Sequence, residues 1–288
     1  MFYHDKELQY KVRVDKPDPA FAKMLQQAIG GIEGEIRVCL QYLFQAWSQR
    51  GPAKYRDMLL DTGTEEMAHI EMLATAVALN LEGAPMSLKD EMAQDKIIGA
   101  VMGGMDARHI LSSGLGAMAT DSNGVPFNGS WVVATGNIGA DMIANVHAES
   151  SGRTLATRLW EMTDDPGMKD FLAFLIARDT MHQNQWLAVI EDLGGMEAVF
   201  PIPNSFPQNM EVKDFNYTFV STQMNDGPIA DGRWTKGASM DGKGEFQVAR
   251  ARPLGGEPKL AAPDPRGHAQ KEQMTGNGIV GKVKNIVK

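Results

Sequence analysis

Carboxylate and imidazole side chains recur in the same order in two halves of the chain. Each half has an isolated glutamate and, further along, a carboxylate and a histidine three positions apart. In a helix, residues at i and i+3 project from one face, so each such pair points the same way. Carboxylates and imidazoles bind divalent and trivalent metal ions, so this repeat indicates a paired metal site. The members are Glu35, Glu66 and His69 in the first half, and Glu149, Asp179 and His182 in the second.

The cost of burial favours this interpretation over chance placement. A single glutamate on an apolar stripe is more often a surface residue or half of an ion pair, and a lone core histidine is usually only hydrogen-bonded. Burying several carboxylates without partners costs several kcal/mol each, and two cations remove that cost. Five such residues on four helices in a repeating order therefore predict a metal site with ligands Glu35, Glu66, His69, Glu149 and His182.

The elements that must position these residues are helices. Four segments before Glu197 show the 3.6-residue apolar period of helices buried along one stripe. The candidate ligands interrupt these stripes near their centres, so they meet at mid-height if the helices form one bundle. The predicted helices cover residues 19–50, 53–81, 137–162 and 165–194.

The connections predict the topology. Short loops join the first two helices and the last two, whereas residues 82–136 form a long crossover with room for a short helix around 95–118. One long crossover is typical of a ferritin-like four-helix bundle, which makes the fold class all-α. The bundle is predicted over residues 1–198. Residues 199–288 hold 8 of the 14 prolines and 11 of the 30 glycines, which predicts an extended tail on the bundle and neighbouring subunits.

Asp179 and Tyr42 are the candidate residues beside the ligands. Asp179 is one methylene shorter than the glutamate that would complete the repeat, which predicts a proton-handling carboxylate just outside the metals. The alternative is an ion pair with Arg178 or Arg153. Tyr42 lies on the stripe of Glu35, where it either orients a ligand carboxylate or is a core tyrosine.

Composition limits the partners. The net charge of -8 is spread along the chain, which argues against nucleic acid and anionic lipid and favours a small neutral substrate. The single cysteine, Cys39, excludes an internal disulfide, and the charged first residues do not resemble a signal segment, so a cytoplasmic protein is expected. No apolar run reaches the roughly 18 residues of a membrane span, so none is expected.

Several strings along the chain resemble the non-haem manganese catalases. The resemblance implies two manganese ions per subunit, hydrogen peroxide as substrate, and a homohexamer. Carried over residue by residue, it implies the same five metal ligands, from Glu35 to His182. The strings are Met1 to Tyr10, Gln41-Tyr-Leu-Phe-Gln-Ala-Trp47, Thr64-Glu-Glu-Met-Ala-His-Ile-Glu-Met-Leu73, Leu175-Ile-Ala-Arg-Asp-Thr-Met-His182, Gly232-Arg-Trp234 and Asp241-Gly-Lys-Gly-Glu-Phe246.

The chain departs from that family at two positions beside the ligands. The family commonly has a glutamate where this chain has Asp179, and some members have a basic residue where Ala148 stands. Both departures concern the movement of protons and the binding of anions or peroxide. Some members also bind a structural calcium ion, and Asp57 and Asp61 match the helical part of that site. Oxygen ligands from the tail would have to complete it.

Two other functions use the same residues. A di-iron ferroxidase or oxygen-activating enzyme shares the bundle and ligand types, because these ligands do not select manganese over iron by affinity. That class predicts a complete second Glu-x-x-His, and Asp179 departs from it. A coat or shell protein that keeps the fold for assembly is the other alternative, and the complete ligand set argues against it.

Overall fold

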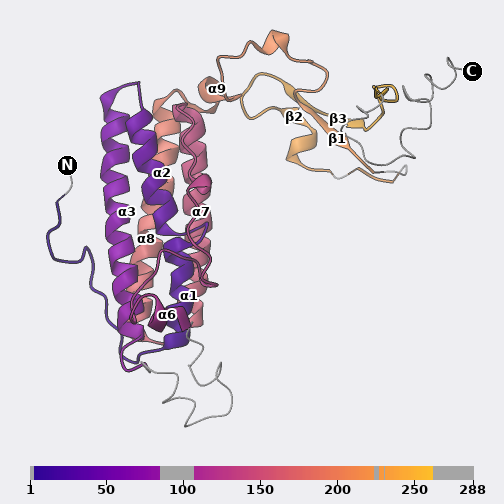
Figure 1. Cartoon of the computed structure of the whole chain (residues 1–288). Helices are drawn as coiled ribbons and strands as arrows, with labels where there is room; N and C mark the ends of the chain where they lie inside the picture. The colour runs from indigo at the N-terminus through magenta and orange to yellow at the C-terminus, as the bar shows by residue number, and fades with distance from the viewer. Residues whose placement is uncertain (1–2, 85–106, 224–226, 230, 262–288) are drawn as a thin grey trace, which may run out of the picture. The chain divides into compact units, whose positions relative to one another are not determined.

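The computed structural model describes residues 3–84, 107–223, 227–229 and 231–261. It divides into two compact units, one of residues 1–213 with 238–244, the other of residues 214–237 with 245–288. The first unit is a bundle of long helices (Figure 1). The predicted all-α, ferritin-like bundle is confirmed. In the part of the chain that is described, no helix is both long and apolar enough to cross a membrane.

The prediction of one continuous helix over residues 19–50 is wrong. The segment is divided into α1 (Pro19–Gly30) and α2 (Glu35–Ser48), with a turn at residues 31–34. Together α1 and α2 occupy the length that α7 spans alone (Figure 1). The chain leaves the helix at Gly31, which is extended, and a Cβ on Gly30 before it would lie 2.5 Å from the backbone of Thr120. The apolar stripe continues across the turn, so periodicity did not reveal it.

Three long helices complete the bundle and agree with the predicted positions. They are α3 (Ala53–Asn80), α7 (Ile138–Met162) and α8 (Pro166–Asp192). Asn137 and Asp165 cap α7 and α8, since their side chains accept hydrogen bonds from the backbone N–H groups of the first turn. The α2–α3 pair and the α7–α8 pair are each joined by a short loop, as expected.

Two apolar clusters fill the bundle, one on either side of the candidate metal ligands along α3 and α8. Burial of each large side chain stabilises the fold by about 1.5–3 kcal/mol. The cluster around α1 includes Phe21, Leu25, Met72, Leu73, Phe171 and Leu172. The cluster around α2 includes Tyr42, Leu59, Met142, Trp186 and Ile190.

The described part of the crossover is held on the bundle by buried glutamines. The side chain of Gln26 donates to the carbonyls of Met118 and Thr120 and accepts from the Met118 N–H. The side chain of Gln41 accepts from the N–H of Val133. Backbone groups of an irregular segment are thereby satisfied without a helix or sheet of their own.

The short helix predicted around residues 95–118 is described only in part. Residues 95–106 lie outside the described residues, and α6 covers Ala107–Leu111. A single turn of 3-10 helix, η1 (Gly129–Trp131), follows before α7. The crossover therefore reaches α7 mainly as irregular chain between residues 112 and 137.

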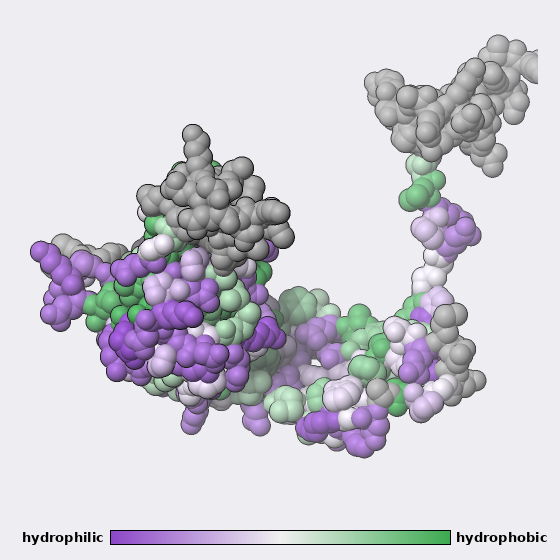
Figure 2. Space-filling model, turned by 90° about the horizontal axis from the view of Figure 1, so that it is seen from below, coloured by the Kyte–Doolittle hydropathy of each residue, from purple (hydrophilic) through white to green (hydrophobic). Residues whose placement is uncertain are grey.

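Short elements follow the bundle helices along the chain. They include α9 (Gly195–Val199) and the 3-10 turns η2 (Gln208–Met210) and η3 (Arg233–Thr235). A three-stranded sheet has the order β1-β3-β2, and β1 pairs in parallel with β3. In the view of Figure 2, hydrophilic residues cover much of the described surface, with hydrophobic residues between them. The strands are β1 (Thr218–Ser221), β2 (Gly237–Ala238) and β3 (Glu245–Arg250).

Candidate metal centre

The five predicted ligands meet between α2, α3, α7 and α8. Glu66, His69, Glu149 and His182 are buried, and Glu35 is partly buried as the first residue of α2. They form two groups of three whose ligand atoms all lie within 4.8 Å of one another. One group is Glu35, Glu66 and His69, and the other is Glu66, Glu149 and His182. Glu66 belongs to both groups, which is the arrangement of a carboxylate that bridges two metal ions.

The imidazoles present the same nitrogen to the carboxylates. Nδ1 of His69 lies 2.7 Å from Oε2 of Glu66 and 3.9 Å from Oε2 of Glu35. Nδ1 of His182 lies 3.0 Å from Oε1 of Glu66 and 3.4 Å from Oε1 of Glu149. Each imidazole therefore faces the shared carboxylate and the terminal carboxylate of its own half.

These atoms are close, yet they do not form regular hydrogen bonds. Both nitrogens of His69, Nδ1 of His182 and Oε1 of Glu66 are buried polar atoms without a hydrogen-bond partner, since Nε2 of His69 lies 3.6 Å from the nearest Glu65 oxygen. Buried polar groups are nearly always paired, and an unpaired one costs about 1–3 kcal/mol. Lone pairs that converge on common points are the geometry of metal ligands. The donor set of oxygens and imidazole nitrogens fits two manganese ions.

Electrostatics shift the pKa of the shared carboxylate and those of the other two ligand carboxylates in opposite directions. Burial raises the pKa of Glu35 and Glu149, and the charge of Glu66 raises both further. Burial also opposes the charge of Glu66, but His69 beside it lowers the Glu66 pKa to about 2. Contacts with carboxylates raise the pKa of His69 to about 10 and of His182 to about 12, against the effect of burial. Metal ions therefore bind here in exchange for protons.

Asp179 is buried beside the two ligand groups and belongs to neither of them. Burial raises its pKa to about 8, with further contributions from the charges of Glu149 and Glu66. The basic residues considered as its ion-pair partners make other contacts. Arg178 binds Glu65, and Arg153 donates to the carbonyl of Ile176 and to Thr180. Asp179 thus stands as a protonated carboxyl group at neutral pH.

Tyr42 makes the contact proposed for it from the sequence. Its hydroxyl donates to Oε1 of Glu149, which links α2 to α7. Trp186 packs on the Tyr42 ring, with 4.8 Å between ring centroids. Burial and the charge of Glu149 raise the Tyr42 pKa well above its ordinary value, so the hydroxyl remains a donor.

Glu65 is a residue of the site that the sequence interpretation missed. Its carboxylate lies 3.1 Å from Nε2 of His182 and 3.6 Å from Nε2 of His69. It also accepts hydrogen bonds from Arg178 and Gln9. One signal was present, because Glu65 precedes His69 by four residues and so lies on the same helical face.

Three other positions named from the sequence belong to neither ligand group. The Asp57 carboxylate is exposed and pairs with its neighbour Arg56, and Asp61 is also exposed. Among the described residues, neither belongs to a group of three that could hold an ion. Cys39 is buried and donates to the carbonyl of Gly63, and burial raises its pKa to about 12. A thiol with this pKa is not a ligand beside hard oxygen donors.

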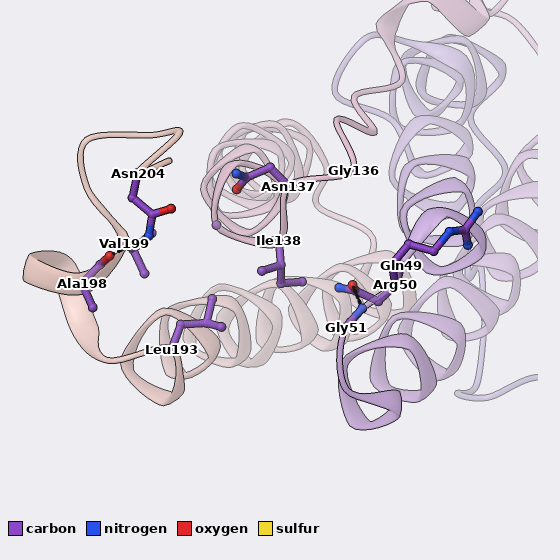
Figure 3. Close-up of a pocket in the computed structure, with 11 residues that line it drawn as sticks. Gln49, Arg50, Gly51, Gly136, Asn137, Ile138, Leu193, Ala198, Val199 and Asn204 are labelled. Atoms are coloured by element: carbon purple, nitrogen blue, oxygen red, sulfur yellow. Dashed lines mark hydrogen bonds between the residues drawn. The ribbon is translucent and has the colours of Figure 1, made fainter. Parts of the chain in front are cut away.

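A separate pocket of about 340 Å³ lies at the end of the bundle near the α2–α3 loop and the start of α7 (Figure 3). Arg50, Asn137, Leu193 and Asn204 are among its lining residues. The side chain of Gln49 accepts from the N–H of Gly51 on its wall. No histidine, cysteine or carboxylate residue is among those that line it, so it offers no second metal site.

Comparisons with known proteins identify the family of this chain. A family model described as manganese containing catalase matches residues 1–282. The chain is 46% identical over 269 residues to a manganese catalase of Bacillus subtilis, covering 93% of this chain and 97% of that protein. It is 38% identical over 269 residues to a manganese catalase of Lactiplantibacillus plantarum, covering 93% and 98%.

A solved structure is similar in fold. The crystal structure of a manganese catalase from Anabaena superposes with a TM-score of 0.66 at 24% identity, covering 86% of this chain and 99% of that one. The family match extends over nearly the whole chain and includes every residue of the two ligand groups. The chain therefore belongs to the manganese-containing catalase family.

Proposed function

We infer that this protein converts two molecules of hydrogen peroxide into two of water and one of dioxygen at a dimanganese centre. The observation that carries the inference is the sharing of Glu66 by two complete ligand groups. A bound manganese pair supplies two-electron redox chemistry between the divalent and trivalent states. One peroxide is thereby reduced to water and a second is oxidised to dioxygen, with no organic cofactor.

Each ligand has a distinct task in this proposal. Glu66 would be shared by the two metal ions, Glu35 and His69 would hold one of them, and Glu149 and His182 would hold the other. Support comes from the contacts of both Nδ1 atoms with Glu66. The apolar clusters on either side keep bulk water out, which strengthens every charge interaction within the site.

We propose Asp179 as the residue that moves protons during the reaction. A general acid or base works best when its pKa lies near the working pH, and burial raises the Asp179 pKa to about 8. Its position beside both ligand groups lets it give a proton to one peroxide and take one from the next. Tyr42 orients the Glu149 carboxylate through its hydroxyl.

Calcium binding at Asp57 and Asp61 stays a proposal. The two carboxylates lie four residues apart on α3 and are both exposed. Calcium takes six to eight oxygen ligands, so even if both carboxylates are bidentate, at least two more oxygens must come from other groups. The test is to measure bound calcium in dialysed wild-type protein and in the Asp57→Asn variant. One calcium ion per chain in wild type and none in the variant supports the site. Wild type without calcium contradicts it.

A cytoplasmic homo-oligomer, with six subunits as the family resemblance implies, is also a proposal. Phe44 and Trp47 on α2 are about half exposed and contact each other edge to face. Exposed aromatic side chains of this size are typical of subunit interfaces. Light scattering of the full chain gives the subunit number. If the tail packs on neighbouring subunits, a chain without residues 205–288 forms smaller particles, and an unchanged mass contradicts that packing.

The proposed function is tested by oxygen release from hydrogen peroxide by protein loaded with manganese. We expect one oxygen per two peroxides from wild type, and none from Glu66→Ala, which removes the shared ligand. Glu71→Ala is the matched control, because Glu71 lies on the same helix and contacts only the N-terminal arm through His4. Wild type that binds manganese without releasing oxygen contradicts the proposal, and ferrous-ion oxidation is then the next assay.

A further inference from the structure

Glu65 faces the outer nitrogens of both candidate ligand histidines. Its Oε2 lies 3.1 Å from Nε2 of His182, and its Oε1 lies 3.6 Å from Nε2 of His69. The two rings lie nearly parallel, with 6.0 Å between centroids and 25° between planes. One carboxylate therefore spans two imidazoles that come from different halves of the bundle.

The inner nitrogens of the same rings point the other way. Nδ1 of His69 and Nδ1 of His182 both face Glu66. Each ring thus lies between two successive carboxylates of α3, with Glu65 outside and Glu66 inside. A neutral imidazole carries one proton, and the nitrogen without it is the one that binds metal. An acceptor at Nε2 consequently decides which nitrogen is available.

We infer that Glu65 is a shared positioning residue that keeps the Nε2–H of both histidines and directs both Nδ1 lone pairs to the metals. This inference rests on the proposed dimanganese site. A carboxylate beside a metal-binding imidazole fixes the ring orientation and makes the nitrogen a better donor. Here a single residue performs this task for both ions, so it couples the two halves of the centre on their outer side.

Glu65 is held in place from two directions. Arg178 on α8 donates through Nε at 2.6 Å and through Nη2 at 3.2 Å. The side chain of Gln9 in the N-terminal arm donates at 2.8 Å. Such paired contacts with a guanidinium fix the plane of a carboxylate. The His182, His69, Arg178 and Gln9 contacts together hold the Glu65 pKa well below its usual range, against the effect of burial.

The N-terminal arm is itself anchored around this point. The Tyr10 ring stacks on Phe174 with 4.4 Å between centroids, and the Tyr10 hydroxyl donates to Asp170. Phe174 also meets the His69 ring edge-on, with 6.4 Å between centroids. Figure 1 shows the arm running along the outer side of α3. The arm thus covers the outer side of Glu65, where Gln9, Phe174 and Arg178 line an open pocket of about 650 Å³.

The Glu65→Gln substitution distinguishes the effect of the carboxylate on the imidazoles from the effect of side-chain size. An amide has one acceptor oxygen and one donor group, so it can accept from one imidazole but not from two. The Glu65→Gln variant therefore keeps the volume and loses one of the two contacts. Arg178→Gln is the second variant, since it leaves the carboxylate in place and frees it from its guanidinium.

The experiment uses the full chain loaded with manganese. The dissociation constant for manganese is measured by competition with a chelator, and electron paramagnetic resonance records the coupled ion pair and its histidine nitrogens. We expect Glu65→Gln to weaken binding about 10- to 100-fold and to change the histidine signal, as loss of such a partner usually does. Arg178→Gln should weaken binding about 10-fold. Glu71→Gln is the control, because it removes another arm contact on α3 and touches neither imidazole.

Two kinds of failure are distinguishable. Wild type that binds no manganese pair and releases no oxygen contradicts the proposed function. The positioning role alone is overturned by a different result. In that result wild type binds the manganese pair and releases oxygen, and Glu65→Gln and Arg178→Gln keep the same manganese affinity and resonance signal. If Glu65→Gln fails to fold, Arg178→Gln decides the question by itself.

Discussion

The two halves of the bundle repeat one motif, yet equivalent positions in it behave differently. Glu66 in α3 and Asp179 in α8 each stand three residues before a ligand histidine, and both are buried. The pKa of Glu66 is lowered to about 2, whereas that of Asp179 is raised to about 8. At neutral pH the first position carries a charge and the second carries a proton.

The contacts of each carboxylate explain the difference. Glu66 lies within 3.0 Å of Nδ1 atoms from both histidines, and their positive charge outweighs its burial. Asp179 is one methylene shorter and belongs to neither ligand group, so burial and the neighbouring carboxylates dominate its pKa. In the proposed function, a repeated sequence motif would therefore supply a bridging ligand in one half and a proton carrier in the other.

Replacing the carboxyl group with an amide at each of the two positions tests this comparison most strongly. Glu66→Gln should lose the metal pair and reduce oxygen release more than about 100-fold, beyond the usual loss for a residue behind a ligand. Asp179→Asn should keep two manganese ions per chain while turnover falls about 100-fold, the typical contribution of a general acid or base. Metal content and turnover are measured on the same samples.

Asp179→Glu is the control for that pair, since it keeps a carboxyl group and restores the symmetric motif. Turnover in this variant should exceed that of Asp179→Asn. If Asp179→Asn retains full turnover, the two halves do not differ in the way described. If Asp179→Asn loses manganese, Asp179 is a metal ligand, and the two halves use their repeated motif in the same way.

The pH dependence of metal binding gives a second comparison. The pKa of His69 is about 10 and that of His182 about 12 in the metal-free fold, so both rings are protonated at neutral pH. Metal binding must release these protons, so affinity rises with pH, by about 10-fold per pH unit for each proton released. Bound manganese should therefore fall as pH falls. Calorimetry in two buffers measures the protons released, and an affinity that does not change with pH would contradict this exchange.

The broken helix is a structural difference between the halves. A Cβ on Gly30, at the end of α1, would lie 2.5 Å from the Thr120 backbone, whereas one on Gly152 in α7 would lie 3.5 Å from its nearest neighbour. Gly30→Ala should therefore lower the free energy of unfolding by about 1–3 kcal/mol, the usual cost of overpacking. Gly152→Ala should raise it by about 0.5–1 kcal/mol, because alanine favours a helix interior. Denaturant unfolding compares the two, and equal effects would contradict the close packing of Gly30 against the crossover.

Much of this site was readable from the sequence because helical periodicity fixes which residues share a face. The spacing of Glu66 and His69 placed them together, and Asp165 before a proline marked the start of α8. The division between α1 and α2 was not readable. Nor was the close approach of Gly30 to the crossover backbone at Thr120, because the two residues are ninety positions apart and no local pattern encodes that contact.

Glu65 was missed for a related reason. Its distance of four residues from His69 is a local signal, but its contacts with His182, Arg178 and Gln9 join segments far apart in sequence. Next to Glu66, it resembled an ordinary solvated residue of the helix. Only the tertiary arrangement shows that consecutive glutamates lie on opposite sides of the same imidazole rings.

The smallest expected effect concerns the hydroxyl that joins the halves at the metal centre. Tyr42 on α2 donates to Glu149 on α7, while Tyr55 on α3 donates to Asp192 at the end of α8. Each hydrogen bond contributes about 1 kcal/mol, so either phenylalanine variant should lower stability by a similar amount. Only Tyr42→Phe should also weaken manganese binding, by about fivefold, since about 1 kcal/mol of orientation is lost at a ligand. An equal loss of affinity in Tyr55→Phe would mean that the link between the halves matters through stability alone, and that Tyr42 does not orient Glu149.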